Sequence, residues 1–521
     1  MAERLKIAEK NEFDKSLKLV AKSSLVVFIG IVLSKIFAYV YRIVIARYYG
    51  PEIYGIFSLA IVILGWFIAI ALLGTSDGVL RFVSIYRGKN QKEKINYVVN
   101  YSTFYLIISG ILAGIFMFFS AEFISIIIFH EPGLIIFLKA FSFFIPFSII
   151  ANSFLSIIRA YEKIGTFSFI FNILQNAVKV IFLIALIYFG LGKSALITSY
   201  ILGTISMFLA AYFICKFYLD LFKKSNVSNS EKKKIKKAFF SYSLPLMFFG
   251  IIMSIFYWID SLSIAYFKDA AAVGFYNAAV PIAMLLGISS AIFIQLFFPI
   301  INKEYSRKNN EVIKQLSKQV AKWIFIINIP VLIILFLFPG AALNILFGKE
   351  YLVAESALKF LSFSAFISSI LIISNQLLSM EGRSKLILFD IVLASIMNLL
   401  LNWLLVPMQT IFSMDNSLGI NGAALATMAS TIFLNLLFFF QVKYYLDIIP
   451  LRRKMLSILI AAIIPTISIL LIKNFITISL FSMVFLLTFF TLFYTFLVIL
   501  FRGLDYNDLM IISSIKRKFF N

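Results

Sequence analysis

Cysteine, histidine and acidic side chains are scarce in this sequence. Of its 521 residues one is a cysteine, Cys215, and one is a histidine, His130. One cysteine excludes an internal disulfide, and one histidine leaves no cluster of transition-metal ligands, so we expect no metal and no cofactor. Asp and Glu number 24 against 47 Lys and Arg. The acids within or beside the hydrophobic runs are fewer than the cations there, which suits an anionic ligand better than a cationic one; these acids are Asp77, Asp260, Glu355 and Asp390.

Catalytic motifs are absent as well. The one segment that looks like a phosphate-binding loop, Leu191 to Ser194, has Ile187 where that motif needs a glycine. No HExxH occurs, and no polar segment is long enough to fold as a catalytic domain. A membrane glycosyltransferase or polymerase would need an arranged set of carboxylates, and the acids between the hydrophobic runs have no such arrangement. The sequence therefore indicates that the protein is not an enzyme.

Long hydrophobic runs dominate what is present. Hydrophobic residues make up 62% of the chain, which is too much for a soluble globule. About 20 apolar residues cross the hydrocarbon of a bilayer, and we predict fourteen such spans. They lie near residues 22–46, 53–77, 97–119, 134–158, 166–189, 194–217, 240–265, 272–300, 320–338, 354–379, 386–406, 420–442, 455–473 and 477–501.

The net charge of +23 is distributed unevenly around these spans. The loops on the side of the N-terminus hold 35 of the 47 cations, whereas the opposite loops hold five: Arg47, Lys193, Lys268, Lys349 and Lys473. Cations concentrate in cytoplasmic loops. We therefore predict a multi-pass protein of the cell (plasma or inner) membrane with both termini cytoplasmic, and we attribute the charge to topology and not to nucleic acid.

An internal repeat divides the chain. The segment Lys35 to Ala60, in which Gly50-Pro51 predicts a sharp turn, returns as Ser254 to Ala279, with Gly55 matched by Gly274 at an offset of 219 residues. An even number of spans separates the copies, which indicates parallel repeats. The predicted fold is all-α, with two pseudo-symmetric six-helix lobes around a central cleft plus a C-terminal helix pair. The predicted parts are an amphipathic arm (1–21), an N-lobe (22–222), a basic linker (223–237), a C-lobe (238–446), and the last two spans with a basic tail (447–521).

Seven cations remain that no predicted loop explains: Lys35, Arg42, Arg81, Lys139, Lys179, Lys322 and Lys359. A charge at mid-bilayer costs about 2.5 to 3.5 kcal/mol, so it usually faces water, an opposite charge or a ligand. Lys35, Tyr39 and Arg42 share one stripe of the first helix, which we assign to substrate binding in the cleft. Arg81, Lys179 and Lys322 receive the same assignment. The alternative for Arg42 is that it snorkels to the membrane interface.

Polar side chains complete the predicted site. Asn172, Gln175, Asn176 and Lys179 share one face of the fifth span, and Asn398 and Asn402 occupy the eleventh. Such amides either bond between helices or contact the substrate, and the pattern leaves both open. Two acids are assigned to coupling or gating. Asp260 is a candidate partner of Arg42 across the cleft, with a role in helix packing as the alternative, and Asp77 is spaced to form a local ion pair with Arg81.

Three segments resemble the polysaccharide repeat-unit flippases. They are Ala46 to Ala60 (ARYYGPEIYGIFSLA), Gly74 to Phe82 (GTSDGVLRF) and Trp258 to Ala279 (WIDSLSIAYFKDAAAVGFYNAA). These flippases form the Wzx-type branch of the multidrug, oligosaccharidyl-lipid and polysaccharide exporter superfamily. The resemblance implies that an undecaprenyl- or dolichyl-linked saccharide moves from the cytoplasmic to the outer leaflet by alternating access.

The resemblance also implies partners. We expect a polyprenyl-(pyro)phosphate-linked saccharide as substrate, membrane lipids, and glycosyltransferases or a polymerase of the same pathway, with the protein itself a monomer. The alternatives are a lipid II flippase and an ion-coupled multidrug exporter of the same superfamily. Such exporters need acids in the first lobe, whereas the first helix carries Lys35 and Arg42 and no carboxylate.

Overall fold

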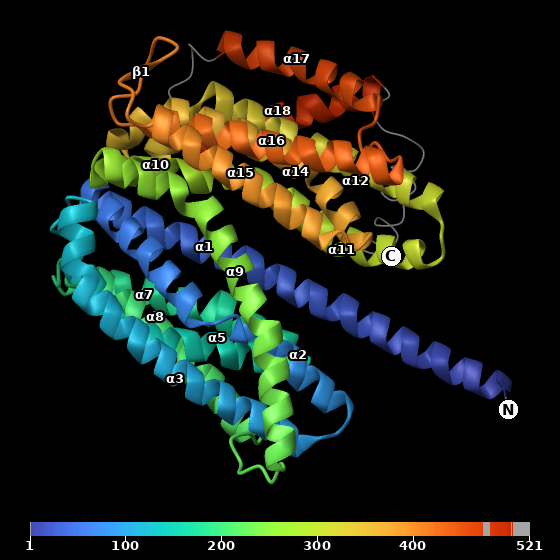
Figure 1. Ribbon diagram of the computed structural model, residues 1–521. Coiled ribbons are helices and arrows are strands. Elements are labelled where there is room, and N and C mark those ends of the chain that lie inside the picture. Colours follow the sequence, from blue (N-terminus) through green and yellow to red (C-terminus); the bar gives the residue numbers. More distant parts are fainter. Residues whose placement is uncertain (1, 473–479, 502, 504–521) are drawn as a thin grey trace. The chain divides into compact units, whose positions relative to one another are not determined.

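The computed structural model describes residues 2–472, 480–501 and 503. This part of the chain is helical almost throughout, as Figure 1 shows, which confirms the predicted all-α class. Its two strands, β1 (Thr410–Ile411) and β2 (Met414–Asp415), form a short antiparallel hairpin. The predicted basic tail (504–521) and the start of the last predicted span lie outside the described residues.

The chain divides into two compact units, one ending at Gly274 and the other beginning at Phe275. The first contains α1 (Ala2–Ala71), α2 (Thr75–Gly88), α3 (Lys92–Glu122), η1 (Phe123–Ile128), α4 (Leu134–Ser142), α5 (Ile145–Ala160), α6 (Ile164–Ser168), η2 (Phe169–Leu174), α7 (Gln175–Tyr188), α8 (Ser194–Phe213), η3 (Ile214–Tyr218), α9 (Asn229–Phe267) and the start of α10 (Ala270–Met284).

The second unit contains the rest of α10 and the elements that follow it. These are α11 (Leu286–Ser306), α12 (Asn310–Leu337), α13 (Pro339–Leu346), η4 (Lys349–Ala354), α14 (Glu355–Met380), α15 (Ser384–Leu405), the hairpin, α16 (Ile420–Leu446), α17 (Lys454–Ile472) and α18 (Leu480–Leu500). Within this unit α17 and α18 pack against each other and against α12.

Eleven helices of the described residues are long and apolar enough to cross a membrane, or twelve if a bent pair counts as one span. The predicted count of fourteen is therefore not confirmed. The first two predicted spans lie in one continuous helical segment, Val32–Ala71, which counts once although it bends at Gly50, and the last is the short apolar helix Val484–Leu500. The fourth is the bent pair α4 and α5, which meet at 55°. Pro146 at the start of α5 is the residue type expected at such a break.

α1 bends sharply at Gly50, as the Gly-Pro sequence predicts. Gly50 has φ 78° and ψ 176°, a conformation that glycine adopts at little cost, and Pro51 follows it. The ring of Tyr41, before the bend, lies 6.0 Å from the ring of Phe57, after it. The two arms of α1 therefore run back along each other as a hairpin.

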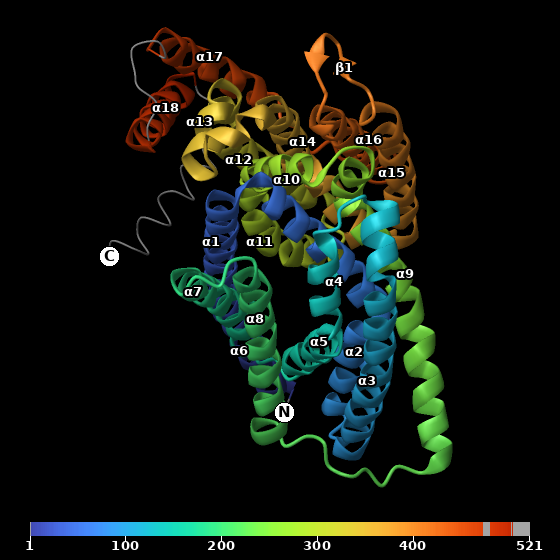
Figure 2. The same ribbon diagram turned by 90° about the vertical axis from the view of Figure 1, so that its left-hand side faces the viewer.

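α9 packs against α1 and α2 inside the first unit, and both views of the ribbon show it beside α2 (Figure 1, Figure 2). Repeat matching assigns most of α9 to the second lobe. Repeats report which segments are equivalent in sequence and do not report which segments are in contact. The structure groups residues 229–274 with the helices that precede them. The predicted two-lobe layout stays a prediction.

The two copies of the repeat meet at a pair of matched glycines. A Cβ on Gly55 would clash with the backbone carbonyl of Ala270, and a Cβ on Gly274 would clash with that of Pro51. Pro51 and Ala270 are themselves matched at the same offset of 219. The backbones of α1 and α10 thus approach closely and reciprocally. The Glu131 side chain also accepts a hydrogen bond of 2.9 Å from the Ala270 N–H at the start of α10.

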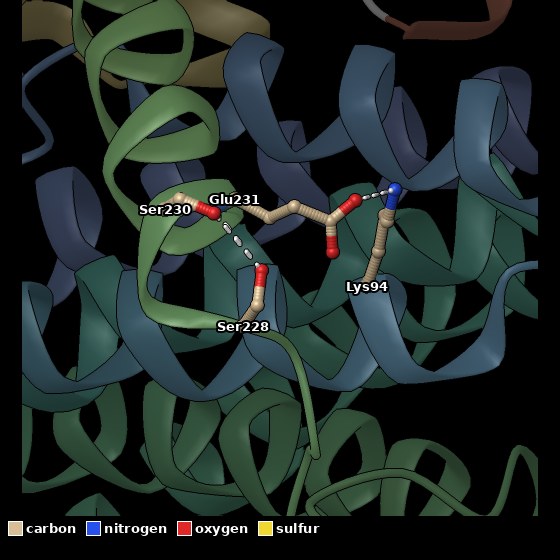
Figure 3. A network of polar contacts seen from close by, with 4 residues as sticks. All are labelled: Lys94, Ser228, Ser230 and Glu231. Carbon is tan, nitrogen blue, oxygen red and sulfur yellow. Dashed lines mark hydrogen bonds and ion pairs between the residues drawn. The ribbon is translucent and has the colours of Figure 1, made fainter.

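The basic linker lies against the start of α3, as Figure 2 shows for the loop between α8 and α9. Figure 3 shows Glu231 of α9, whose carboxylate lies 2.8 Å from the Lys94 ammonium. The Asn226 N–H donates to Glu93 at 2.7 Å. Asn100 donates to the carbonyl of Lys223 at 3.0 Å. These bonds order the segment that joins α8 to α9.

Candidate functional site

The predicted stripe of α1 brings its polar residues together around Arg42. Lys35 is exposed, and Tyr39 and Arg42 are half-buried. The Arg42 guanidinium hydrogen-bonds to the hydroxyl of Tyr54, and Arg42 lies close enough to Lys35 and Tyr39 for its charge to act on both. Tyr54 lies beyond the bend at Gly50, so the hairpin fixes the direction of the Arg42 side chain. The spacing of the stripe predicted the grouping of Lys35, Tyr39 and Arg42 but not the role of Tyr54.

Lys179 of α7 lies over an aromatic ring of α8. Its ammonium is 4.3 Å from the centre of the Tyr200 ring, and its alkyl stem lies against Gly203. The Tyr200 ring in turn contacts Phe57 and Phe141, with ring centres 6.1 Å and 5.1 Å away. A cation over a tyrosine ring gains about 0.5 to 2 kcal/mol. This contact holds the Lys179 charge in a defined place within a half-buried environment.

The amide side chains on one face of the fifth predicted span differ in their hydrogen bonding. The Asn176 side-chain NH₂ donates to Ser34 of α1 at 3.1 Å, and that of Asn172 donates to Ser168 at 3.1 Å. Asn176 therefore links α7 to α1. Gln175 is half-buried and makes no side-chain hydrogen bond within the described residues. Of the three amides, Gln175 is the one left for a ligand.

Asp77 and Arg81 do not form the ion pair that their spacing predicts. Both side chains are exposed, and no Asp77–Arg81 pair occurs among the described residues. The Arg81 guanidinium instead stacks 4.1 Å from the centre of the Tyr242 ring on α9. Tyr242 is far away in sequence, so spacing along α2 gave no sign of this contact. The contact joins α2 to α9.

Asp260 is buried on α9, with 6% of its surface exposed. Its pairing with Arg42 stays a prediction.

The ion pair of Lys139 changes another expectation. Lys139, one of the seven cations that no predicted loop explains, lies 2.5 Å from the Glu122 carboxylate. The sequence count of acids beside the spans did not include Glu122. One cation of this set therefore already has an acidic partner, and the excess of cations over acids in and beside the spans is one pair smaller than the sequence predicted.

The second unit holds the remaining predicted residues. Lys322 of α12 is fully buried. On α15, the Asn402 side-chain NH₂ donates to the side-chain oxygen of Asn398 at 2.8 Å and to its carbonyl at 3.0 Å. Both asparagines are buried. These two amides thus bond to each other along one helix.

The predicted site residues fall into distinct groups. In the first unit they gather at the Arg42 stripe, at the α7–α8 contact around Lys179, and at the α2–α9 contact around Arg81. The aromatic partners Tyr54, Tyr200 and Tyr242 were missed. Tyrosines recur in the spans that face a cation-bearing span, and this is the signal that would have found them. Sequence alone does not show which spans face each other, so the signal could not be used.

Comparisons with known proteins agree with the resemblance. A family profile described as "Polysaccharide biosynthesis protein" matches residues 20–305, and one described as "MatE" matches residues 245–404. A Shigella flexneri protein provisionally named an O-antigen transporter is 24% identical over 357 residues, a match that covers 66% of this chain and 80% of that protein.

Two solved structures share the fold. One is described as the lipid II flippase MurJ in an inward closed conformation, with a TM-score of 0.73 and 19% identity over 93% of this chain and 100% of that one. The other is an inward-facing multidrug resistance MATE family transporter, with a TM-score of 0.64 and 15% identity over 80% of this chain and 94% of that one. At such identities the likeness establishes the fold.

Proposed function

The chain belongs to the polysaccharide biosynthesis protein family, and from this we propose that it is a flippase for a lipid-linked oligosaccharide or polysaccharide repeat unit. It moves the saccharide from the cytoplasmic to the outer leaflet of the cell membrane by alternating access. The family match over residues 20–305 carries the proposal. The O-antigen transporter name of the Shigella flexneri relative supports it.

Cations in the membrane-length helices suit this substrate. A polyprenyl pyrophosphate headgroup is anionic, and lysine and arginine side chains replace the water that it loses inside the membrane. Lys35 and Arg42 contact the phosphates, with Arg42 already oriented by Tyr54. We assign substrate binding also to Lys179 and Arg81 of the first unit and to Lys322 of the second. The amides Gln175 and Asn172 of the first unit, and Asn398 and Asn402 of the second, are assigned to contacts with the sugar or to bonds between helices.

Energy for transport is available without ATP. Moving one negative charge outward gains about 2.3 kcal/mol per 100 mV of inside-negative potential. Asp260 and Asp77 are the acids assigned to coupling or gating. The cation-rich loops face the cytoplasm, which places both termini there. We expect a monomer that receives its substrate from glycosyltransferases and passes it to a polymerase of the same pathway.

A deletion strain tests the proposal. Without this chain, cells should accumulate the lipid-linked saccharide on the cytoplasmic leaflet and lose the corresponding polysaccharide from their surface, and the plasmid-borne gene should restore it. The position of the saccharide is measured by labelling intact cells and inverted vesicles with an impermeant sugar reagent. Normal surface saccharide in the deletion strain would contradict the proposal.

A multidrug exporter is the second candidate, because the MatE profile matches residues 245–404. It predicts that the deletion strain becomes sensitive to cationic dyes while its surface polysaccharide is unchanged. The flippase proposal predicts the opposite pair of results. The two phenotypes therefore separate the candidates in one strain.

A further inference from the structure

The second unit contains a cavity of about 750 Å³ where the first part of α12 meets the segment that joins α16 to α17. Its lining residues are Gln315, Lys318, Gln319, Ile449, Leu451, Arg452, Arg453 and Lys454. Half of them are cations, and no carboxylate is among them. The volume falls in the range of small-ligand sites, about 300 to 1,000 Å³. None of the substrate residues assigned above lines it.

One arginine of this cavity is held in place before any ligand arrives. The Arg452 guanidinium donates to the side-chain oxygen of Gln319 at 2.5 Å, and Gln319 is buried. The Arg452 carbonyl accepts a hydrogen bond of 2.9 Å from the N–H of Met455, which fixes the turn at the start of α17. An oriented guanidinium loses less entropy when it binds an oxyanion, and its planar fork matches the oxygens of phosphate.

Apolar surface begins directly beside these cations. Ile449 and Leu451 line the cavity, and both are partly exposed, at 39% and 40%. α17 then exposes a run of aliphatic side chains: Leu456, Leu459, Ile460 and Ile463. A charged group that is continuous with an apolar face is the arrangement that a phosphate headgroup and its hydrocarbon chain require. A free inorganic anion would make no use of the apolar part.

Both segments of the cavity belong to loops that the charge pattern places at the cytoplasmic face. Lys318 lies in the loop before the ninth predicted span, and Arg452 lies in the loop before the thirteenth. Their cations therefore sit at the depth of the inner-leaflet headgroups. We propose that this cavity binds the phosphate group of an anionic lipid in the inner leaflet, with the lipid chain on α17.

Lipid retention measures this binding directly, and it is independent of transport. The full-length protein is reconstituted in nanodiscs of phosphatidylcholine with phosphatidylglycerol, then released, and the lipids that remain bound are counted by native mass spectrometry. The test variant is Lys318→Gln with Arg453→Gln, which leaves the Arg452–Gln319 bond intact. The matched control is Lys385→Gln with Lys443→Gln, two exposed cations of the same unit that lie outside the cavity.

We expect the wild type and the control to retain phosphatidylglycerol in preference to phosphatidylcholine. The test variant should retain about tenfold less phosphatidylglycerol. A tenfold ratio corresponds to about the binding free energy that one hydrogen bond to a charged group contributes. Arg452→Lys keeps the charge but not the fork, and it should fall between the two. Equal retention by the test variant and the wild type, or an equal loss in the control, would overturn the proposal.

Inorganic pyrophosphate separates the two sources of phosphate. If the lipid chain contributes, millimolar pyrophosphate should leave most of the bound phosphatidylglycerol in place. Complete displacement would contradict the lipid assignment, because the apolar wall would then add nothing. Should a cavity variant elute as an aggregate in size-exclusion chromatography, the single variant Arg453→Gln, at an exposed side chain, provides the same comparison.

Discussion

Arg42 lies in a helix of membrane length, where an unsatisfied guanidinium would be expensive, and the Tyr54 hydroxyl accepts one of its hydrogen bonds. A hydrogen bond to a charged group contributes about 1.5 to 3 kcal/mol. We therefore predict strong coupling between Arg42→Gln and Tyr54→Phe. The double variant should unfold at nearly the same temperature as Arg42→Gln alone, as measured by differential scanning fluorimetry of the purified protein.

Tyr49→Phe provides the matched control for that pair. Its hydroxyl donates to the carbonyl of Gly192 at 2.7 Å, and it is close to Arg42 in sequence but does not share its partner. The shifts of Tyr49→Phe and Arg42→Gln should add, since independent sites add within about 0.5 kcal/mol. If the shifts in unfolding temperature of Tyr54→Phe and Arg42→Gln also add, the Arg42–Tyr54 hydrogen bond contributes nothing to stability.

The crossing of α1 and α10 is a feature of whole elements. At Gly55 a Cβ would meet the backbone of Ala270, which cannot rotate away as a side chain can. We predict that Gly55→Ala lowers stability by about 1 to 3 kcal/mol, the usual cost of overpacking. Gly65→Ala is the control, because no atom lies within 4 Å of its added Cβ. There alanine should be neutral or stabilise the helix by up to about 1 kcal/mol.

Thermal unfolding of the two glycine variants measures this difference. A lower midpoint for Gly55→Ala beside an unchanged or higher one for Gly65→Ala is the expected result. Equal midpoints would mean that the helices separate at no cost, and the close crossing would not be a stabilising contact.

The docked linker is the second prediction at this scale. The Asn226 N–H bonds to Glu93 at 2.7 Å, so Glu93→Ala should loosen the segment that contains Lys223 and Lys224. Trypsin should then cleave there about fivefold faster, because the open population rises by that factor for each 1 kcal/mol lost. Glu52→Ala, at an exposed acid elsewhere in the first unit, should leave the rate unchanged. Equal rates in both variants would show that Glu93 does not hold the linker.

At the scale of the whole molecule, local signals predicted the helices, the bend at Gly50 and the stripe of Lys35 and Arg42. Hydrophobic runs and residue spacing determine these features within a few turns of helix. Contacts between distant segments were not predictable in the same way. Tyr200 under Lys179, Tyr242 under Arg81, and Lys318 beside Arg452 each depend on which spans become neighbours. The π-helical segments η1 to η3 were also missed, since one extra residue in a turn leaves little trace in composition.

Reconstituted flipping tests the central claim most directly. The purified protein is placed in liposomes that carry the lipid-linked saccharide extracted from the deletion strain, and its arrival in the opposite leaflet is followed with an impermeant sugar-oxidising reagent. The wild type should translocate the saccharide, faster when a potential drives negative charge outward. The variant Lys35→Ala with Arg42→Ala should insert normally but lose most of this activity, whereas Lys193→Ala, at an exposed loop cation, should retain it. Wild-type flipping by the Lys35→Ala, Arg42→Ala protein would contradict the account.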